Sequence, residues 1–263
     1  MASVNKVKPQ AASLDIQPLK QGRLKLRMMG QTPLYFNSMS SKAMRDLLIG
    51  GGKKTAAQRK QIKHNPEQEF RDSVYKKNFG ETLLCFPAPG VKGAMATAAL
   101  ETDGITKSSV QRLIFLPQTH IQIWGIPQLK IDMVRSADMN KTPDMRTRAY
   151  LPYWCAEVEI AYVQPTLNAH SIVSLLTNAG AVVGIGDFRQ EKGRGSFGTF
   201  SVHSEESMGS FQREWDALMK QGREVQQRHM DNPLYADDQT AELMAFLEIE
   251  RARRDSEEVL AAE

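Results

Sequence analysis

Hydrophobic and polar residues alternate along several segments of this chain with the period of a β-strand. In the first segment, Leu24, Leu26 and Met28 alternate with three cations, Arg23, Lys25 and Arg27. Such a strand has one apolar face and one face that carries only positive charge. Other alternating or apolar runs predict strands over 82–86, 110–116, 120–125, 129–134, 156–163 and 200–202.

Helical spacing occupies the stretches between these strands. A run of small residues over 91–100 follows Pro87-Ala88-Pro89-Gly90, and residues 168–183 place an apolar residue on one side of each turn. After residue 204 the spacing predicts at least two amphipathic helices, divided at Asn232-Pro233. The chain order β-α-β-β-α-β is that of a ferredoxin-like unit, so the fold class is α+β with extra strands.

The charge distribution divides the chain into three parts. Residues 1–20 lack periodicity and predict a flexible arm. Residues 21–203 form the folded body, with a basic helical insertion over 37–80, and residues 204–263 form an acidic helical extension. Residues 1–203 carry 27 Lys or Arg and 15 Asp or Glu, whereas residues 204–263 carry 7 and 15. A basic body attracts polyanions, and an acidic tail either covers a basic partner or keeps the protein in solution.

A glycine-rich loop lies between the last predicted helix of the body and its last strand. The loop contains five glycines, Gly184, Gly186, Gly193, Gly195 and Gly198. It also contains three cations, Arg189, Lys192 and Arg194. Glycine permits positive φ and lets backbone N–H groups approach a ligand, and the cations suit phosphate oxygens. The loop predicts nucleic-acid binding, although a long glycine-rich hairpin accounts for it equally well.

Further cations lie beside aromatic residues or in the insertion. Arg146 and Arg148 precede Tyr150, Tyr153 and Trp154, in what we expect to be a loop, and a base stacked on such side chains gains about 1–3 kcal/mol. Trp154 fits a core position equally well. The complete set of candidate nucleic-acid contacts is Arg23, Lys25, Arg27, Lys53, Lys54, Arg59, Lys60, Lys63, Lys92, Arg146, Arg148, Phe188, Arg189, Lys192 and Arg194, together with the five glycines.

Three stretches resemble the RAMP superfamily, RRM-like proteins that include backbone subunits of CRISPR effector complexes. They are Thr32-Pro33-Leu34 after the first strand, Phe86–Ala94 with its Lys92-Gly93-Ala94, and the glycine loop. Together they frame about residues 22–203. The loop, Gly-Ile-Gly-Asp-Phe-Arg followed by Phe-Gly-Thr-Phe, is also similar to that of a group of bacteriophage proteins.

The resemblance implies an RRM-like core that binds single-stranded RNA and stacks head to tail along it, together with other effector subunits. Some members cleave RNA with an aspartate near the first strand. Asp46 lies in the basic insertion without the surrounding pattern of that site, so the resemblance does not carry catalysis to this chain.

The chemistry of catalysis and metal binding finds little support in the sequence. The five histidines have no metal-ligand spacing, and Gly50–Thr55 departs from the P-loop pattern. Asp138, Asp144 and Asp187 could in principle hold magnesium, but turns explain the first two equally well. We expect no enzyme activity, no cofactor and no metal.

Cys85 and Cys155 stand far apart, no secretory signal precedes them and no run is long enough to cross a membrane. We therefore expect buried thiols in a cytoplasmic protein.

The resulting hypothesis is a sequence-tolerant protein that binds single-stranded RNA or DNA and oligomerises along it. Two alternatives remain open. One is a phage protein that coats or anneals single-stranded DNA during recombination, and the other is a RAMP-like interaction protein that interferes with a host CRISPR complex through its acidic helices.

Overall fold

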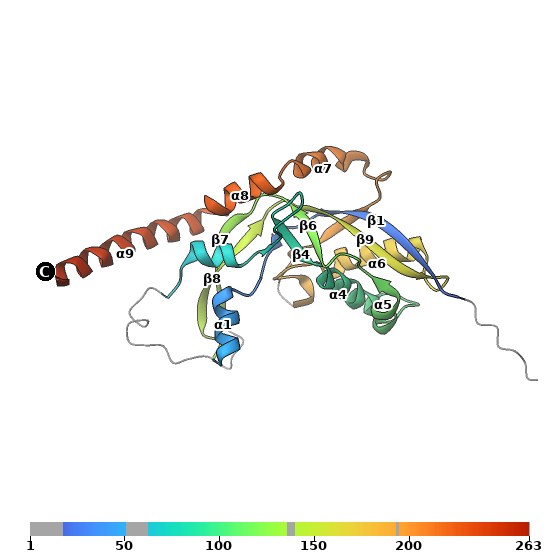
Figure 1. The fold of residues 1–263 in the computed structure, drawn as a ribbon, viewed down its shortest axis with the longest axis horizontal. Helices are drawn as coiled ribbons and strands as arrows, with labels where there is room; N and C mark the ends of the chain where they lie inside the picture. Colours follow the sequence, from blue (N-terminus) through green and yellow to red (C-terminus); the bar gives the residue numbers. More distant parts are fainter. Residues whose placement is uncertain (1–17, 51–62, 136–139, 193–194, 263) are drawn as a thin grey trace, which may run out of the picture.

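The computed structural model describes residues 18–50, 63–135, 140–192 and 195–262 (Figure 1). Most of the expected N-terminal arm lies outside these ranges. The chain forms a mixed α+β structure with two antiparallel-rich sheets, helices on the main sheet and a helical C-terminal part.

The main sheet has the strand order β10-β1-β9-β6-β4-β3, with β5 also paired to β9. Its strands are β1 (Lys20–Gly30), β3 (Tyr75–Lys76), β4 (Leu84–Pro87), β5 (Ile114–Phe115), β6 (His120–Trp124), β9 (Cys155–Gln164) and β10 (Phe200–His203). All of their pairings are antiparallel. The run β10-β1-β9-β6, with α4 (Ala88–Ala98) after β1 and α6 (Ala169–Val182) after β9, has the 4-1-3-2 order of a ferredoxin-like unit, which confirms the predicted core.

A second sheet extends from this core in the order β11-β7-β8-β2. Its strands are β2 (Leu34–Tyr35), β7 (Gln128–Arg135), β8 (Pro143–Leu151) and β11 (Leu234–Tyr235). The β7–β8 hairpin is inserted between β6 and β9. Its register pairs Lys130 with Arg148 and Asp132 with Arg146, so these four side chains share one face. The expectation that the two arginines lie in a loop is therefore wrong, because both belong to β8.

Short helices connect the sheets. The basic insertion contains α1 (Ser41–Ile49) and α3 (Pro66–Asp72). A short 3-10 turn (Ala99–Glu101) and α5 (Lys107–Leu113) follow α4. The strand predicted over 110–116 is present only at Ile114–Phe115, because the Thr106 side chain accepts a hydrogen bond from the Ser109 amide and starts a helix instead.

The principal core lies between the main sheet and the helices α4 and α6. Leu26 and Met28 of β1 and Leu175 and Leu176 of α6 are buried there, and the alanines of α4 allow the two helices to pack closely. Trp154 is also buried, as its core interpretation requires. On the opposite face of the sheet a smaller cluster contains Met29, Trp124, Cys155, Met208, Trp215 and Leu218.

Both cysteines are buried, and burial raises the pKa of Cys85 to about 11 and that of Cys155 to about 12. Their thiols are therefore protonated at neutral pH and unreactive.

The C-terminal part consists of a 3-10 turn (Gly209–Phe211), α7 (Gln212–Met219), α8 (Arg223–Asp231) and α9 (Asp238–Ala262). The buried amide of Gln226 in α8 accepts hydrogen bonds from the Leu83 and Leu84 amides and donates to the carbonyls of Ile123 and Gly125. These contacts fix α8 to the sheet, whereas α9 projects from the body (Figure 1). None of the described helices is long and apolar enough to span a membrane.

Candidate nucleic-acid interface

The glycine loop is folded tightly back on itself. Gly184 and Gly198 have φ of 73° and 71°, and the Ile185 amide donates to the Gly198 carbonyl at 2.9 Å. A Cβ atom on Gly198 would lie 1.7 Å from the Ile185 carbonyl oxygen, and one on Gly195 would lie 1.3 Å from that of Phe188. These glycines are therefore required because two stretches of chain cross without room for a side chain.

The loop amides are largely used within the protein. Besides the Ile185 bond, Asp187 donates to the Tyr35 carbonyl at 3.1 Å and Gly198 donates to the Pro33 carbonyl at 2.8 Å. The idea that the loop presents bare N–H groups to a ligand does not hold for these three residues. The loop instead fastens the end of α6 to the segment around β2, and Gly186, with φ of 86°, faces the Tyr35 carbonyl directly.

Arg148 joins the glycine loop to the β7–β8 hairpin. Its Nη2 lies 2.8 Å from Oδ2 of Asp187, and its guanidinium stacks 4.6 Å from the centre of the Phe188 ring. Only 4% of Arg148 is exposed, and this burial lowers its pKa below the usual arginine value. The ion pair is therefore shielded from water and holds the loop in one position.

An aromatic cluster surrounds this connection. The buried Tyr35 ring makes edge-to-face contacts with Tyr150, Phe188 and Phe197 at centroid distances of 5.1, 5.3 and 4.9 Å. Phe188 has φ of 52°, a conformation that few non-glycine residues adopt. Phe188 thus packs with the cluster and beneath the arginine, so the structure gives it a supporting position.

A cavity of about 470 Å³ lies between β8, α1 and α3, and we call it the hairpin cavity. Its polar lining consists of Asn37, Ser38, Ser40, Glu69, Asp72, Ser73, Arg146, Thr147 and Arg148. The Nη1 atom of Arg148 is buried and has no hydrogen-bond partner among the described residues. Arg146 is exposed, and within the same ranges no carboxylate pairs with it. Arg146 therefore keeps unused donors at this cavity, whereas the unpartnered nitrogen of Arg148 is enclosed by protein.

A second cavity of about 360 Å³, here called the motif cavity, brings together residues that are far apart in the sequence. Phe86 and Pro87 come from the end of β4 and Gly90 from the start of α4, while Gly186, Asp187 and Arg189 come from the glycine loop. Asn37 lines both cavities, so the two are neighbours around Arg148 and Asp187. Arg189 is turned back into its own loop, since it contacts Glu191 at 3.0 Å and the Gly186 carbonyl.

Three of the four cations of β1 are paired with acids. Arg23 contacts Glu159 at 3.2 Å, and Lys25 contacts Glu157 at 2.5 Å, both glutamates lying on the neighbouring strand β9. Arg27 contacts Glu205 at 3.1 Å and lies 5.0 Å above the Trp215 ring. The structure thus separates these three cations from Arg146 and Arg148 and places a carboxylate beside each.

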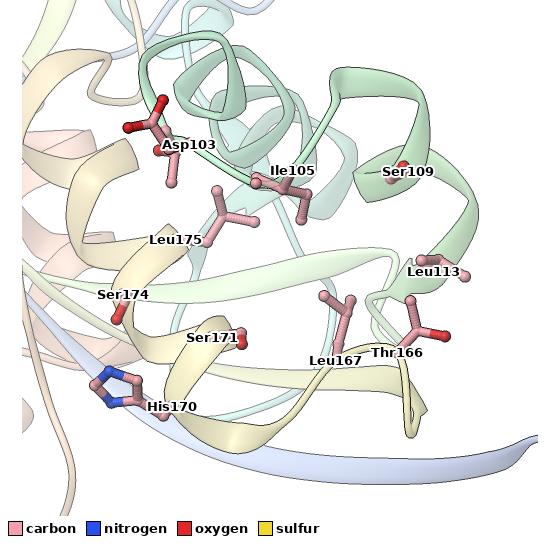
Figure 2. Close-up of a pocket in the computed structure, with 12 residues that line it drawn as sticks. Asp103, Ile105, Ser109, Leu113, Thr166, Leu167, His170, Ser171, Ser174 and Leu175 are labelled. Atoms are coloured by element: carbon pink, nitrogen blue, oxygen red, sulfur yellow. The ribbon is translucent and has the colours of Figure 1, made fainter.

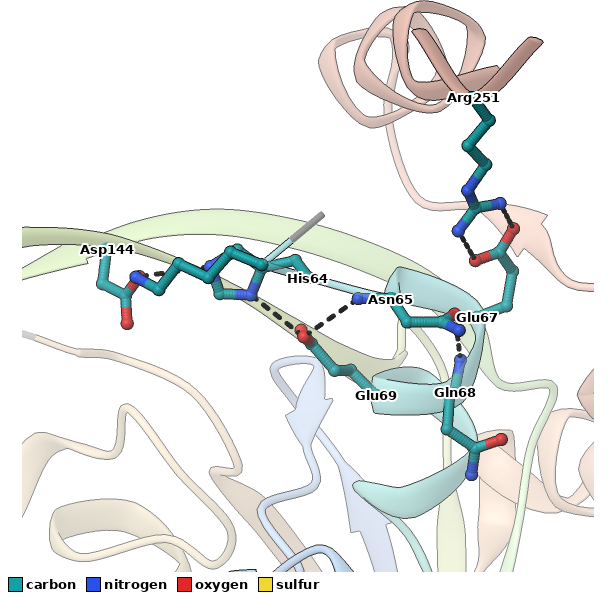
Figure 3. Close-up of polar contacts among 8 residues, drawn as sticks. His64, Asn65, Glu67, Gln68, Glu69, Asp144 and Arg251 are labelled. Atoms are coloured by element: carbon teal, nitrogen blue, oxygen red, sulfur yellow. Dashed lines mark hydrogen bonds and ion pairs between the residues drawn. The ribbon is translucent and has the colours of Figure 1, made fainter. Parts of the chain in front are cut away.

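The end of the basic insertion is anchored next to β8 (Figure 3). Lys63 pairs with Asp144, and His64 Nδ1 and Nε2 lie 2.9 Å from Glu69 and 3.3 Å from Asp144. The Lys63 hydrogen bond holds the pKa of Asp144 below its usual range. On the other side of α3, Arg251 of α9 makes a two-pronged contact with Glu67 at 2.8 and 3.0 Å. Asp144 is thus part of an ion-pair cluster beside Arg146.

The remaining candidates are not gathered at the two cavities. Lys92 donates to the Gln111 carbonyl at 2.8 Å and lies 5.5 Å from the Phe115 ring, on the other side of Pro87. Several other candidates lie outside the described residues: Lys53, Lys54, Arg59, Lys60, Gly193, Arg194 and the side chain of Lys192. The same is true of Asp138, one of the three aspartates considered for magnesium.

Sequence reasoning missed the polar residues of β7. Lys130 pairs with Asp237 and lies 5.8 Å from the Tyr150 ring, while the half-buried Asp132 accepts a hydrogen bond from Tyr35. Burial raises the pKa of Asp132, and burial first and the nearby Asp132 second raise that of Tyr35. The sequence signal for these residues is that Lys130 and Asp132 alternate on β7 opposite Arg148 and Arg146. This signal can be recognised only when residues 143–151 are assigned to a strand.

Another cavity, of about 360 Å³, lies between α6 and the segment before α5 (Figure 2). Asp103, His170 and several serines line it, which are residue types of hydrolytic sites. Figure 2 shows Asp103 and His170 at different ends of the wall, separated by Ser174 and Leu175, so they do not form a relay. Within the described ranges no group of three His, Cys, Asp or Glu is placed to hold a metal ion.

Neither a protein-family model nor a curated protein matches this sequence. Among solved structures, the chain is similar to one in the cryo-EM structure of the Type III-B Cmr-beta bound to cognate target RNA, with 12% identity and a TM-score of 0.38 over 70% of this chain. It spans 60% of that chain's length. It is also similar to Cmr6 from Pyrococcus furiosus, with 8% identity and a TM-score of 0.37, covering 70% of this chain and 98% of Cmr6. At these scores the overlays are too loose to assign function, which depends on this chain's own geometry.

Proposed function

We propose that this protein binds single-stranded nucleic acid with little sequence preference, and that several copies assemble along one strand. The surface is the hairpin cavity and the neighbouring motif cavity, where phosphates of the strand would meet the guanidinium groups of β8. RNA is the expected strand, as the RAMP-like motifs imply, in an effector complex or a bacteriophage setting. Binding takes place without cleavage and needs no metal or cofactor.

The observation that carries this proposal is the pair Arg146 and Arg148. Arg148 is locked by Asp187 and Phe188 and places a fixed positive charge at the wall of the cavity, and Arg146 is exposed two residues away on the same face of β8. A fixed arginine beside an adaptable one suits a chain of phosphates, because each guanidinium offers several donors in a planar fork.

The decisive experiment is a fluorescence-anisotropy titration with labelled RNA and DNA of about 30 nucleotides, long enough for several sites of usual size. Affinity for RNA should fall with salt by a log-log slope of about −0.7 per contacted phosphate. Absence of saturable binding to either strand at low salt would contradict the proposal. Tighter binding to DNA, together with annealing of complementary strands, would favour the recombination alternative.

A matched pair of variants tests the position of the surface. Arg146→Glu should weaken RNA binding about tenfold, the cost of one charge-assisted contact, and reduce the salt slope by about 0.7. Arg213→Glu makes the same charge change at an exposed position on α7 and should leave affinity nearly unchanged. Equal losses in both variants would place the interface elsewhere. Incubation of both labelled strands with magnesium or manganese should leave them intact.

A further inference from the structure

Helix α1 carries large apolar side chains that remain exposed in the part of the chain that the structure describes. Leu47, Leu48 and Ile49 are 71%, 86% and 76% exposed, and Met44, one turn earlier, is 51% exposed. The helix itself is well formed, since Ser40 accepts a hydrogen bond from the Ala43 amide at its start and Gly50, with φ of 80°, ends it. Clustered exposed leucines on a capped helix indicate a contact surface.

Helix α9 presents a second exposed apolar surface. Its inner side is fixed to the body by the buried Met244 and by the pair of Arg251 with Glu67. On the outer side, Phe246 and Ile249 are 65% and 69% exposed, and their spacing of three residues places them on one face. Figure 1 shows this helix projecting from the body, so its outer side is open to a partner.

The two helices lie in segments of opposite charge. Helix α1 contains two cations, Lys42 and Arg45, and a single acid, whereas residues 238–263 contain eight Asp or Glu and three arginines. At the apolar faces themselves, the exposed Arg45 lies one turn before Leu48 and Ile49, and the exposed Glu242 lies one turn before Phe246. This complementarity favours contact between the two segments and disfavours contact of either with itself.

We propose that α1 of one copy of this chain docks on the outer face of α9 of a second copy. Among the described residues neither face is covered, and we infer that each finds its partner in another molecule. The contact is head to tail: each copy uses α1 toward one neighbour and α9 toward the other, which generates an open chain or a ring. This contact identifies the surfaces by which copies of the chain would assemble in the proposed function. It rests on the proposed assembly alone and does not depend on nucleic-acid binding.

The test measures self-association of the full chain without nucleic acid, by sedimentation velocity over a wide range of concentration. The wild type should form species larger than a dimer. Leu48→Ser and Phe246→Ser should each sediment as monomers, and Leu100→Ser, which removes a similarly exposed leucine after α4, should behave as wild type. Circular dichroism checks that each variant is folded.

Mixing the two variants separates this contact from a symmetric one. Leu48→Ser retains a good α9 and Phe246→Ser retains a good α1, so the mixture should form a dimer that neither variant forms alone. A dimer of Phe246→Ser alone, or a wild type that remains monomeric at every concentration, would overturn the proposal. Arg45→Glu and Glu242→Arg should each weaken association, and the double variant should restore it.

Nucleic-acid binding gives an independent readout. An oligonucleotide of about 6 nucleotides occupies little more than one protomer, so Leu48→Ser should bind it as tightly as the wild type does. If this short strand binds neither protein while association is intact, the proposed function fails and the docking contact stands. If the short strand binds both proteins equally and association is absent, the docking contact fails and nucleic-acid binding stands.

Discussion

Strands β1 and β8 both carry cations at alternate positions, but the structure treats the two rows differently. Arg23, Lys25 and Arg27 of β1 each lie beside a glutamate, supplied by β9 or by the segment after β10. On β8, Arg148 is held by one aspartate and Arg146 remains exposed. Alternating cations on a strand therefore do not identify a ligand surface by themselves, because acids of the same protein can pair with them. Arg146 stays exposed although Asp132 is its register partner on β7.

The largest effect on stability is expected within the β8 row, between its buried and its exposed arginine. Arg148→Met removes the partner of the part-buried Asp187 and the stacking on Phe188, so the free energy of unfolding should fall by about 3 kcal/mol. Arg146→Met, two residues away and exposed, should change it by less than about 0.5 kcal/mol. Urea denaturation measures both values. Equal effects would mean that Arg148 does not fix the glycine loop to β8.

The glycine loop, which holds Arg148 of β8 through Asp187, can be tested at Gly198. Gly198→Ala places a Cβ against the Ile185 carbonyl at φ of 71°, and should cost about 2 kcal/mol or more. Gly50→Ala also meets positive φ, at 80°, but has open space around it, so about 1 kcal/mol is expected. Thermal denaturation measures the loss of stability in each variant. The loss in Gly198→Ala reports crowding together with backbone conformation, and the loss in Gly50→Ala reports backbone conformation alone.

Within the β1 row, the degree of burial should set the effect. Arg27 is largely covered and also contacts Trp215, so Arg27→Ala should reduce stability by about 1 kcal/mol. Arg23 is well exposed, and Arg23→Ala should cost at most a few tenths of a kcal/mol because water screens its ion pair. Chemical denaturation in parallel provides the comparison. A larger loss for Arg23 would show that the outer end of β1 is more constrained than its exposure suggests.

The smallest effect is expected for the pair of Lys63 with Asp144 at the start of β8. The pKa of Asp144 is lowered in the folded protein, mainly by the Lys63 hydrogen bond. The pair therefore stabilises the fold above the carboxylate's ordinary pKa of 3.8, and this contribution is lost as pH falls through the lower folded value. In Lys63→Gln the pKa of Asp144 should rise toward 3.8, as followed by NMR. An unchanged value would assign the shift to His64 instead.

The ferredoxin-like core was readable from the sequence because its strands and helices have clear periods. Leu24, Leu26 and Met28 alternate in β1, and Ile172, Leu175 and Leu176 repeat with helical spacing in α6. The hairpin strand β8 was not readable from the sequence, because Arg146, Thr147 and Arg148 are all polar. Thr147 and Arg148 are buried only by tertiary contacts. Burial of a polar strand depends on partners that a local pattern does not contain.

The candidate site was readable in part. Arg146, Arg148 and the glycines were identified by type, and the structure brings the described ones to one region. The pairing of Arg23 and Lys25 was foreseeable from Glu157 and Glu159, which alternate in β9, but only once β1 and β9 were known to be neighbours. The folding of the glycine loop onto Pro33 and Tyr35 joins residues more than 150 positions apart, and no spacing in the sequence reveals it.

The four hydrogen bonds of Gln226 have a practical consequence for anyone who shortens this chain. A fragment ending near residue 203 keeps every strand of the ferredoxin-like unit but loses Gln226 and Arg223, whose guanidinium caps the carbonyls of Lys77, Gly80 and Thr82. Backbone groups around the start of β4 would then lose their hydrogen-bond partners within the protein. The acidic C-terminal part is thus an edge cover for the sheet, and a soluble truncation should retain α8 and end beyond it.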